Sequence, residues 1–184
     1  MSKFILRLFG WTVVGERPDA DKYIATCAPH TSNFDALWFF LAMMALKERP
    51  KILIKSAYYR FPIKRAFLAV GGVPVERGIG ARNMAQQMAQ YIDSVDRGAL
   101  MLAPEGSRSF QKFWKIGFYQ IAETTKLPIY FAYADYSKKT LGIHPTPLWI
   151  TGNVAEDMDV VRAFYADIVA KHPERVGPIR LKRE

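Results

Sequence analysis

His30 and Asp35 form the first pair of side chains in this sequence whose types and spacing suit chemistry. They lie five positions apart in the segment APHTSNFD, between a strand-like run at 22–28 and a helical pattern at 33–46. On one continuous helix, residues five apart point about 140° away from each other, so we place His30 in the loop before the helix. From there the imidazole can fold back onto the carboxylate, which holds one ring nitrogen protonated and leaves the other free to accept a proton. The pair therefore predicts a general base that needs no covalent nucleophile.

Two further polar segments follow apolar runs. The segment APEGSRSF at 103–110 follows the run 99–102, and the segment GGVPVERG places Arg77 at the end of another short apolar run. In an open parallel sheet, ligands bind outside the carboxyl ends of the strands. We therefore expect these segments to meet His30 at one site.

With a fourth block, these segments make the sequence resemble the glycerophospholipid acyltransferase family, typified by lysophosphatidic acid acyltransferase. The blocks follow the family order: His30–Asp35, Gly72–Arg77, Pro104–Ser109 and Leu127–Ile129. Pro29 stands where the family usually has Asn, and Ser107 where it usually has Thr. The blocks cover roughly residues 20–135, and the set is specific although each block alone is not.

The resemblance implies an enzyme of phospholipid biosynthesis. It would move a fatty acyl chain from acyl-CoA or acyl carrier protein to a hydroxyl of a lysophospholipid, with lysophosphatidate as the expected acceptor. His30 is then the general base, Asp35 orients it, and the hydroxyl attacks the thioester directly. Backbone N–H groups at the start of the helix after His30 are candidate donors to the oxyanion, because helix N-termini favour negative charge. No cofactor is expected, since the acyl donor is a substrate.

The resemblance also assigns six residues to substrate binding: Lys55, Arg77, Glu105, Gly106, Ser107 and Arg108. Arg77 and Arg108 suit a phosphate because a guanidinium can bond two phosphate oxygens at once, and Lys55 would add a point charge. Glu105 is expected to hydrogen-bond the acceptor hydroxyls or to pair with an arginine. Gly106 is expected to let the backbone approach the ligand.

Other reactive residue types give weaker signals. Cys27 is the single cysteine, which excludes an internal disulfide, and its apolar neighbours favour a small buried hydrophobe over a nucleophile. Ser107 lacks the GxSxG setting of a hydrolase nucleophile. With one cysteine and three dispersed histidines, no metal site is expected.

The net charge of +9 favours an acidic partner. Basic and aromatic residues are interleaved at 51–67, which suits the headgroup region of an anionic membrane surface. No RNP, KH or zinc-finger signature is present, so no nucleic-acid partner is expected. The strongly apolar run 36–46 is shorter than the ~20 residues that a spanning helix needs. We therefore expect a cytoplasmic protein, peripheral at the inner face of the membrane.

Alternating patterns predict a single α/β domain with a largely parallel sheet flanked by helices. The expected strands are 22–28, 51–55, 73–76, 99–103, 128–134 and 148–151, and the expected helices are 33–46, 59–69, 81–95, 116–124 and 157–171. We divide the chain into an N-terminal segment, 1–19, and an acyltransferase domain, 20–184. The N-terminal segment either lies on the membrane or packs on the core.

Two alternatives stay open at this point. The first keeps the chemistry and changes the lysolipid acceptor. The second is a non-catalytic basic protein that binds lipid or nucleic acid, for which removal of His30 would leave function intact and binding would fall steeply with salt.

Overall fold

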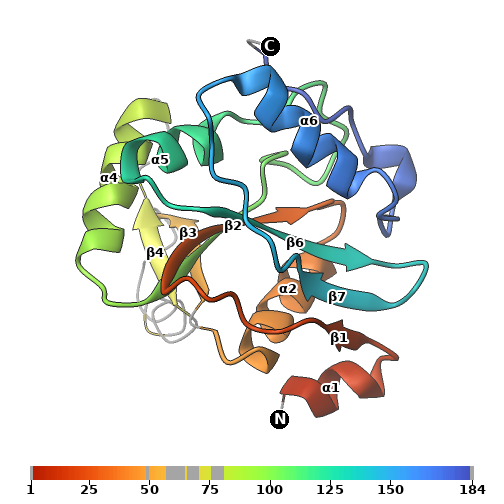
Figure 1. The fold of residues 1–184 in the computed structure, drawn as a ribbon. Helices are drawn as coiled ribbons and strands as arrows, with labels where there is room; N and C mark the ends of the chain where they lie inside the picture. Colours follow the sequence, from red (N-terminus) through yellow and green to blue (C-terminus); the bar gives the residue numbers. More distant parts are fainter. Residues whose placement is uncertain (1, 49, 57–64, 66–70, 76–80, 183–184) are drawn as a thin grey trace.

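A mostly parallel sheet forms the centre of the molecule. The computed structural model describes residues 2–182 apart from 49, 57–64, 66–70 and 76–80 (Figure 1). Within them lie the strands β1 (Thr12–Val14), β2 (Lys22–Ala28), β3 (Pro50–Lys55), β4 (Gly72–Val75), β5 (Gly98–Leu102), β6 (Ile129–Asp135) and β7 (Thr140–Ile143). Their order in the sheet is β1-β7-β6-β2-β5-β3-β4.

Strand direction divides the sheet into two parts. The β4, β3, β5, β2 and β6 strands pair in parallel, β7 is antiparallel to β6, and β1 is parallel to β7. The β2 strand lies in the middle, with β5 on one side and β6 on the other. The carboxyl ends of these three parallel strands therefore share one edge of the sheet.

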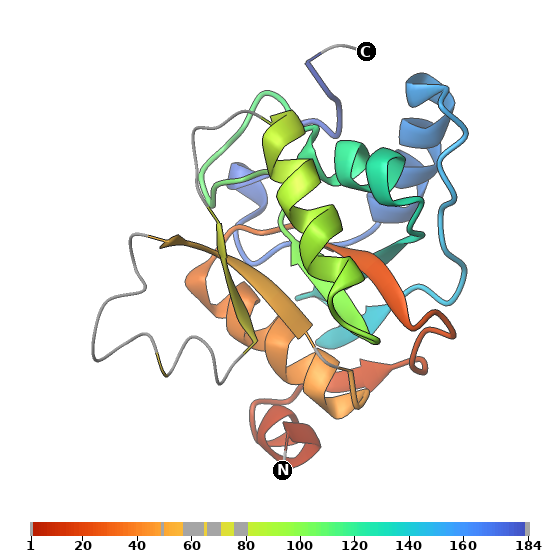
Figure 2. The same ribbon diagram turned by 90° about the vertical axis from the view of Figure 1, so that its left-hand side faces the viewer.

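Helices cover both faces of the sheet, which makes a three-layer α/β domain and confirms the predicted fold class. One layer holds α4 (Ala81–Asp93), α5 (Gly117–Thr125) and α6 (Val154–Tyr165), and the other holds α1 (Ser2–Leu8) and α2 (Asn33–Ala45). Figure 2 shows the sheet between α4 and α5 on one side and α2 and α1 on the other.

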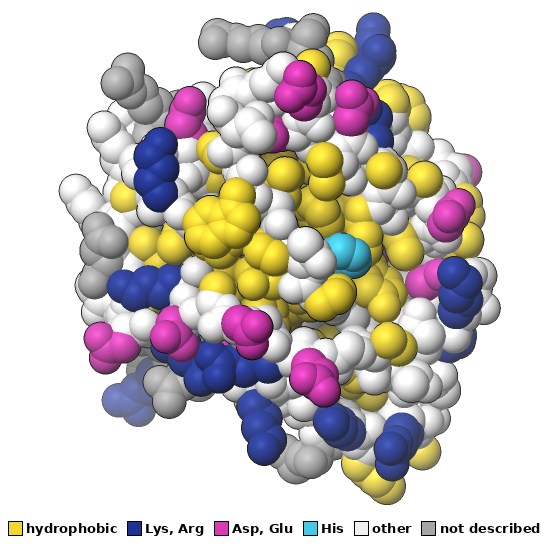
Figure 3. Space-filling model, in the orientation of Figure 1, with side chains coloured by type: hydrophobic (Ala, Val, Ile, Leu, Met, Phe, Trp, Pro, Cys, Tyr) yellow, Lys and Arg dark blue, Asp and Glu magenta, His cyan; other side chains and the backbone are white. Residues whose placement is uncertain are grey.

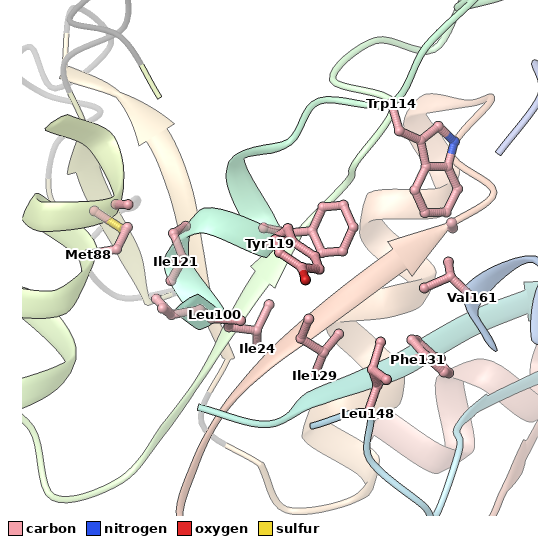
Figure 4. Packing of buried hydrophobic residues seen from close by; sticks show 14 of the residues in the cluster. Ile24, Met88, Leu100, Trp114, Tyr119, Ile121, Ile129, Phe131, Leu148 and Val161 are labelled. Atoms are coloured by element: carbon pink, nitrogen blue, oxygen red, sulfur yellow. The ribbon is translucent and has the colours of Figure 1, made fainter. Parts of the chain in front are cut away.

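Residues of β2 alternate between the two cores. Ile24 and Ala28 join the cluster under α4, α5 and α6, part of which Figure 4 shows, whereas Tyr23, Ala25 and Cys27 join the cluster under α1 and α2. Because both faces are covered, six of the seven residues of β2 are buried and the strand lacks a polar face.

Most predicted elements are confirmed. The strand predicted at 22–28 has those bounds. The prediction at 51–55 differs from the observed strand by one residue at its start, and those at 73–76, 99–103 and 128–134 differ by one residue at each end. The helices predicted at 33–46, 81–95 and 116–124 correspond to α2, α4 and α5. The helix predicted at 59–69 lies outside the described residues except for Arg65.

The strand predicted at 148–151 is wrong. Leu148 makes an isolated bridge to Ile129, and the pairing extends no further. Pro145 and Pro147 have no N–H to give to a ladder, which limits pairing just before this residue. Two strands, β1 and β7, were not predicted, because each has only three or four residues and shows no clear alternation.

The last helix is shifted relative to its prediction at 157–171. It begins at Val154, because Asn153 is the cap and accepts a hydrogen bond from the Glu156 N–H. It ends at Tyr165, after which the chain turns back and Val169 accepts a hydrogen bond from the Tyr136 N–H.

The N-terminal helix has one buried and one exposed side. Leu6 packs into the core near Trp11, whereas Phe4 and Leu8 are exposed. Among the described residues, none of the helices has the length and apolar character needed to cross a membrane. The division of the chain at residue 20 stays a prediction.

Candidate active site

The site lies where the carboxyl ends of β2, β5 and β6 meet. His30 follows β2 by two residues, the segment 103–108 follows β5, and Tyr136 follows β6 directly. Because β2 pairs with both of the other strands, residues 75 to 101 positions apart in the chain reach one place. The predicted meeting of His30 with the APEGSRSF segment is thereby confirmed: the His30 N–H donates a 2.9 Å hydrogen bond to Glu105 Oε1.

Asp35 is fixed by the start of α2. Ser32 caps this helix, and Asp35 at its third residue completes a capping box. The Oδ2 atom of Asp35 accepts hydrogen bonds from the N–H groups of Thr31 at 2.6 Å and Ser32 at 2.7 Å. The Oδ1 atom accepts the Tyr136 hydroxyl at 2.5 Å. Asp35 is fully buried, so this set of donors holds its carboxylate in one position.

The same contacts keep Asp35 charged. Burial by itself would favour the protonated acid, but the contacts from His30, Tyr136 and the Ser32 and Thr31 N–H groups outweigh it and hold the pKa of Asp35 below its ordinary value. The hydroxyl of Tyr136 is affected in the opposite direction: burial and the neighbouring Asp35 raise its pKa, so Tyr136 stays a donor.

His30 lies between Asp35 and open space. Its Nδ1 is 3.6 Å from Asp35 Oδ2, and its side chain is 18% exposed. This distance is longer than a formed hydrogen bond, as is common for catalytic pairs without substrate. A carboxylate beside Nδ1 favours the tautomer with the proton on that atom, and Nε2 is the nitrogen left to act on a ligand.

Glu105 supports the His30 loop from within the protein. Its Oε1 atom accepts the His30 N–H, whereas its buried Oε2 atom has no hydrogen-bond partner. Burial raises the pKa of Glu105, and the His30 N–H opposes this only in part. Glu105 is not among the residues that line the cavity described next. Its predicted contact with the acceptor stays a prediction.

A cavity of about 530 Å³ opens in front of His30. Its polar wall contains His30, Ser107, Arg108 and Lys115, and its apolar wall is formed by residues of β2, α2, β3, β5 and α5 that include Cys27, Phe39, Ile52, Met101, Phe118 and Ile121. The cavity can therefore contact both polar groups and an apolar chain.

Gly106 shapes the polar wall. Its φ of +68° is a conformation that side chains disfavour, and an added Cβ would lie 3.0 Å from Lys115 Cγ. Lys115 thus packs over the glycine and lines the cavity beside Arg108.

The predicted residues fall into three groups. His30, Gly106, Ser107 and Arg108 line the cavity, while Asp35 and Glu105 lie behind His30. Lys55 ends β3, but its side chain is outside the described part of the structure, as is the whole of Arg77.

Two residues near the site, Tyr136 and Cys27, were not among the predicted site residues. Tyr136 was missed, although its place after the strand predicted at 128–134 was a usable signal. Cys27 lines the cavity as a buried thiol, and burial raises its pKa, so it stays protonated, as expected of a small hydrophobe.

Comparison with known proteins agrees with this geometry. The family model described as Acyltransferase matches residues 12–133, which is more than half of the chain and includes His30, Asp35 and the 103–108 segment. Neither a curated protein nor a solved structure matches the chain. The resemblance stated from the sequence is confirmed: this chain belongs to the acyltransferase family of glycerophospholipid and lysophosphatidic acid acyltransferases.

Proposed function

We propose that this acyltransferase moves a fatty acyl chain from acyl-CoA or acyl carrier protein to a hydroxyl of a lysophospholipid, with lysophosphatidate as the acceptor. The observation that carries the proposal is the pair formed by His30 Nδ1 and the buried Asp35 carboxylate, 3.6 Å apart, with His30 lining a cavity that also has many apolar lining residues. Family membership supplies the reaction class.

His30 acts as the general base in this reaction. Nε2 takes the proton of the acceptor hydroxyl as its oxygen bonds to the thioester carbonyl carbon, and the imidazolium is stabilised by the ionised Asp35. The tetrahedral intermediate then collapses, the carbon–sulfur bond breaks, and the thiolate leaves with the proton from the imidazolium. The ester and the free thiol are the products, and no acyl-enzyme is needed.

Candidate oxyanion donors lie on the cavity wall. The N–H groups at the start of α2 were expected to serve, but those of Thr31, Ser32, Phe34 and Asp35 are already bonded within the capping box. We therefore assign charge stabilisation to the Arg108 and Lys115 side chains, which line the same cavity as His30.

Membrane association of the protein is part of this proposal, because the acceptor is a lipid. Exposed apolar side chains lie on α1 and α2 and just after α1: Phe4, Leu8, Phe9, Phe34, Leu37 and Met44. Phe9 and Phe34 both contact the Trp38 ring, so the two helices contribute to one surface. A different face of the molecule, which carries α6 and β7, has a hydrophobic centre with basic and acidic side chains around it (Figure 3).

The first test is acyl transfer from labelled acyl-CoA to lysophosphatidate in mixed micelles, with His30→Ala and Asp35→Asn alongside. Phosphatidate that forms only with the acceptor, and disappears in both variants, is the expected result. Thiol release without acceptor would indicate a hydrolase instead. Product formed only with a different lysolipid would identify that lysolipid as the acceptor. If no product formed with any lysolipid and either donor, the proposal would be overturned.

A further inference from the structure

A second cavity adjoins the first. It has a volume of about 440 Å³ and is bordered by the first turn of α2, the loop 107–109 and the segment that follows α6. Ser107 and Arg108 line both cavities, so they form the wall between them. The second cavity therefore begins one side chain away from the space in front of His30.

The charged side chains that line this second cavity are all basic. They are Arg108, Lys171 and Arg175, which come from two parts of the chain more than 60 residues apart, and no acidic side chain is among the described lining residues. Glu174 lies nearby and contacts the Arg175 Nε at 3.6 Å and the His172 Nδ1 at 3.4 Å, outside the lining.

Two of the three basic groups, Lys171 and Arg175, are held in place by residues that also line the cavity. The Nζ atom of Lys171 lies 4.3 Å from the centre of the Phe34 ring, and Arg175 Nη1 donates to the Thr31 carbonyl at 3.3 Å. The His172 N–H donates to Thr31 Oγ1, which ties this segment to the residue that directly follows His30. The basic cluster is thus fixed relative to the reacting centre.

Hydroxyl groups complete the lining. Ser32 Oγ accepts the Phe34 N–H, which leaves its own O–H as a donor, and Ser107 and Ser109 share one hydrogen bond between their hydroxyls. Three cations and several O–H donors around one cavity are the groups that recognise a phosphate.

We propose that this cavity binds a phosphate group of a substrate and that Lys171 and Arg175 are specificity residues for it. The inference rests on the proposed acyl transfer and goes beyond the family blocks, since both residues lie outside the matched region 12–133. The phosphate belongs either to the acceptor headgroup or to the nucleotide part of coenzyme A.

Kinetics of Lys171→Gln distinguish these sources. Lys126→Gln, at the exposed end of α5, is the matched control for the loss of one positive charge. If the acceptor supplies the phosphate, Lys171→Gln raises the KM for lysophosphatidate about tenfold, with kcat changed less than twofold, and gives no comparable increase with monoacylglycerol. If the donor supplies it, the increase appears with acyl-CoA and is absent with acyl-pantetheine. Arg175→Lys keeps the positive charge but loses the planar guanidinium group, so it should raise the same KM by a smaller factor.

A binding measurement separates this inference from the reaction itself. Isothermal titration of the His30→Ala protein with glycerol 3-phosphate and with adenosine 3′,5′-diphosphate should show one ligand whose affinity Lys171→Gln weakens about tenfold, while Lys126→Gln leaves it unchanged. This result would support the phosphate site even if no lysolipid were acylated. Binding of neither ligand, or equal weakening by both lysine variants, would overturn it.

Discussion

At the scale of single residues, the Asp35 carboxylate makes two kinds of contact. It closes the first turn of α2 through the Thr31 and Ser32 N–H groups, and it presents the same Oδ2 atom to His30. Tyr136 binds the other oxygen and so prevents the carboxylate from turning away. The geometry of the His30 and Asp35 pair therefore depends on the hydroxyl of Tyr136, which directly follows β6.

Tyr136→Phe tests this dependence. Loss of a hydrogen bond to a buried charge should lower the free energy of unfolding at pH 7 by about 1.5–3 kcal/mol. It should also raise the pKa of Asp35, because one group that favours the charged form is gone. A carboxyl group with a lowered pKa in the folded state stabilises the protein at pH values above its pKa in the unfolded chain, and this stabilisation is lost as pH falls. The difference in free energy of unfolding between variant and wild type should therefore become smaller in acid.

Urea unfolding at several pH values measures that gap, with Tyr133→Phe as control. Tyr133 is on β6, three residues before Tyr136, and its hydroxyl lies near Gly142. A gap that stays constant from pH 7 to acid would contradict the assignment.

Glu105 should show the opposite pH dependence. Its pKa is raised above the ordinary 4.5, so the folded state binds the proton more strongly than the unfolded chain. Wild type should therefore lose stability relative to Glu105→Gln as pH rises from about 4.5 through the raised pKa. Unfolding midpoints of the two proteins between pH 4 and pH 8 provide the measurement. Parallel curves would show that Glu105 has an ordinary pKa.

Contacts of single residues could be predicted from the sequence less fully than the helices and strands. The HxxxxD spacing was enough to place His30 before a helix and Asp35 in its first turn, because both follow from the helical period. The role of Tyr136 could not be predicted, since it depends on β6 lying beside β2, and strand order is not encoded in any local pattern. The contact of Glu105 with the His30 N–H depends on the pairing of β5 with β2 for the same reason.

At the scale of elements, the start of α2 links folding to activity. Ser32 Oγ accepts the Phe34 N–H, and the Ser32 N–H binds Asp35, so one residue both caps the helix and positions the carboxylate. The amphipathic spacing predicted the helix well, because its buried residues recur along one side. The end of α6 was not predicted from its sequence. The segment after the helix makes tertiary contacts, such as the hydrogen bond from the Tyr136 N–H to the Val169 carbonyl, and these contacts end the helix.

Ser32→Ala and Asn153→Ala compare two caps. Each should lower the free energy of unfolding by about 1 kcal/mol, as for the loss of other N-caps. Only Ser32→Ala should also lower kcat, because only α2 begins at the site. Equal effects of both variants on kcat at a temperature well below unfolding would mean that the cap acts through overall stability.

At the scale of the whole molecule, α1 and α2 lie on one side of the sheet and expose apolar side chains there. The composition predicted an affinity for anionic surfaces, but it could not show which residues are exposed. The basic and aromatic stretch 51–67 that suggested a membrane surface lies mostly outside the described residues. The surface on α1 and α2 is instead defined by exposed phenylalanine and leucine residues.

The double variant Phe4→Ser and Leu8→Ser tests this surface. Both side chains are more than 70% exposed, so the free energy of unfolding should change little. Co-sedimentation with vesicles that contain anionic lipid should fall at least fivefold, because two groups that would enter the interface are removed. Val160→Ser on α6 is the control for an exposed apolar residue elsewhere, and equal loss of binding in both would place the contact on another surface.

The segment after α6 affects when the site can form during synthesis of the chain. Thr31, next to the proposed general base, is held by His172 and Arg175, and Asp35 is held by Tyr136. During synthesis on the ribosome, a nascent chain that has exposed only residues 12–133 would contain every family block and none of these three supports. We therefore expect the supports of Thr31 and Asp35 to be complete only after residue 175 has left the exit tunnel.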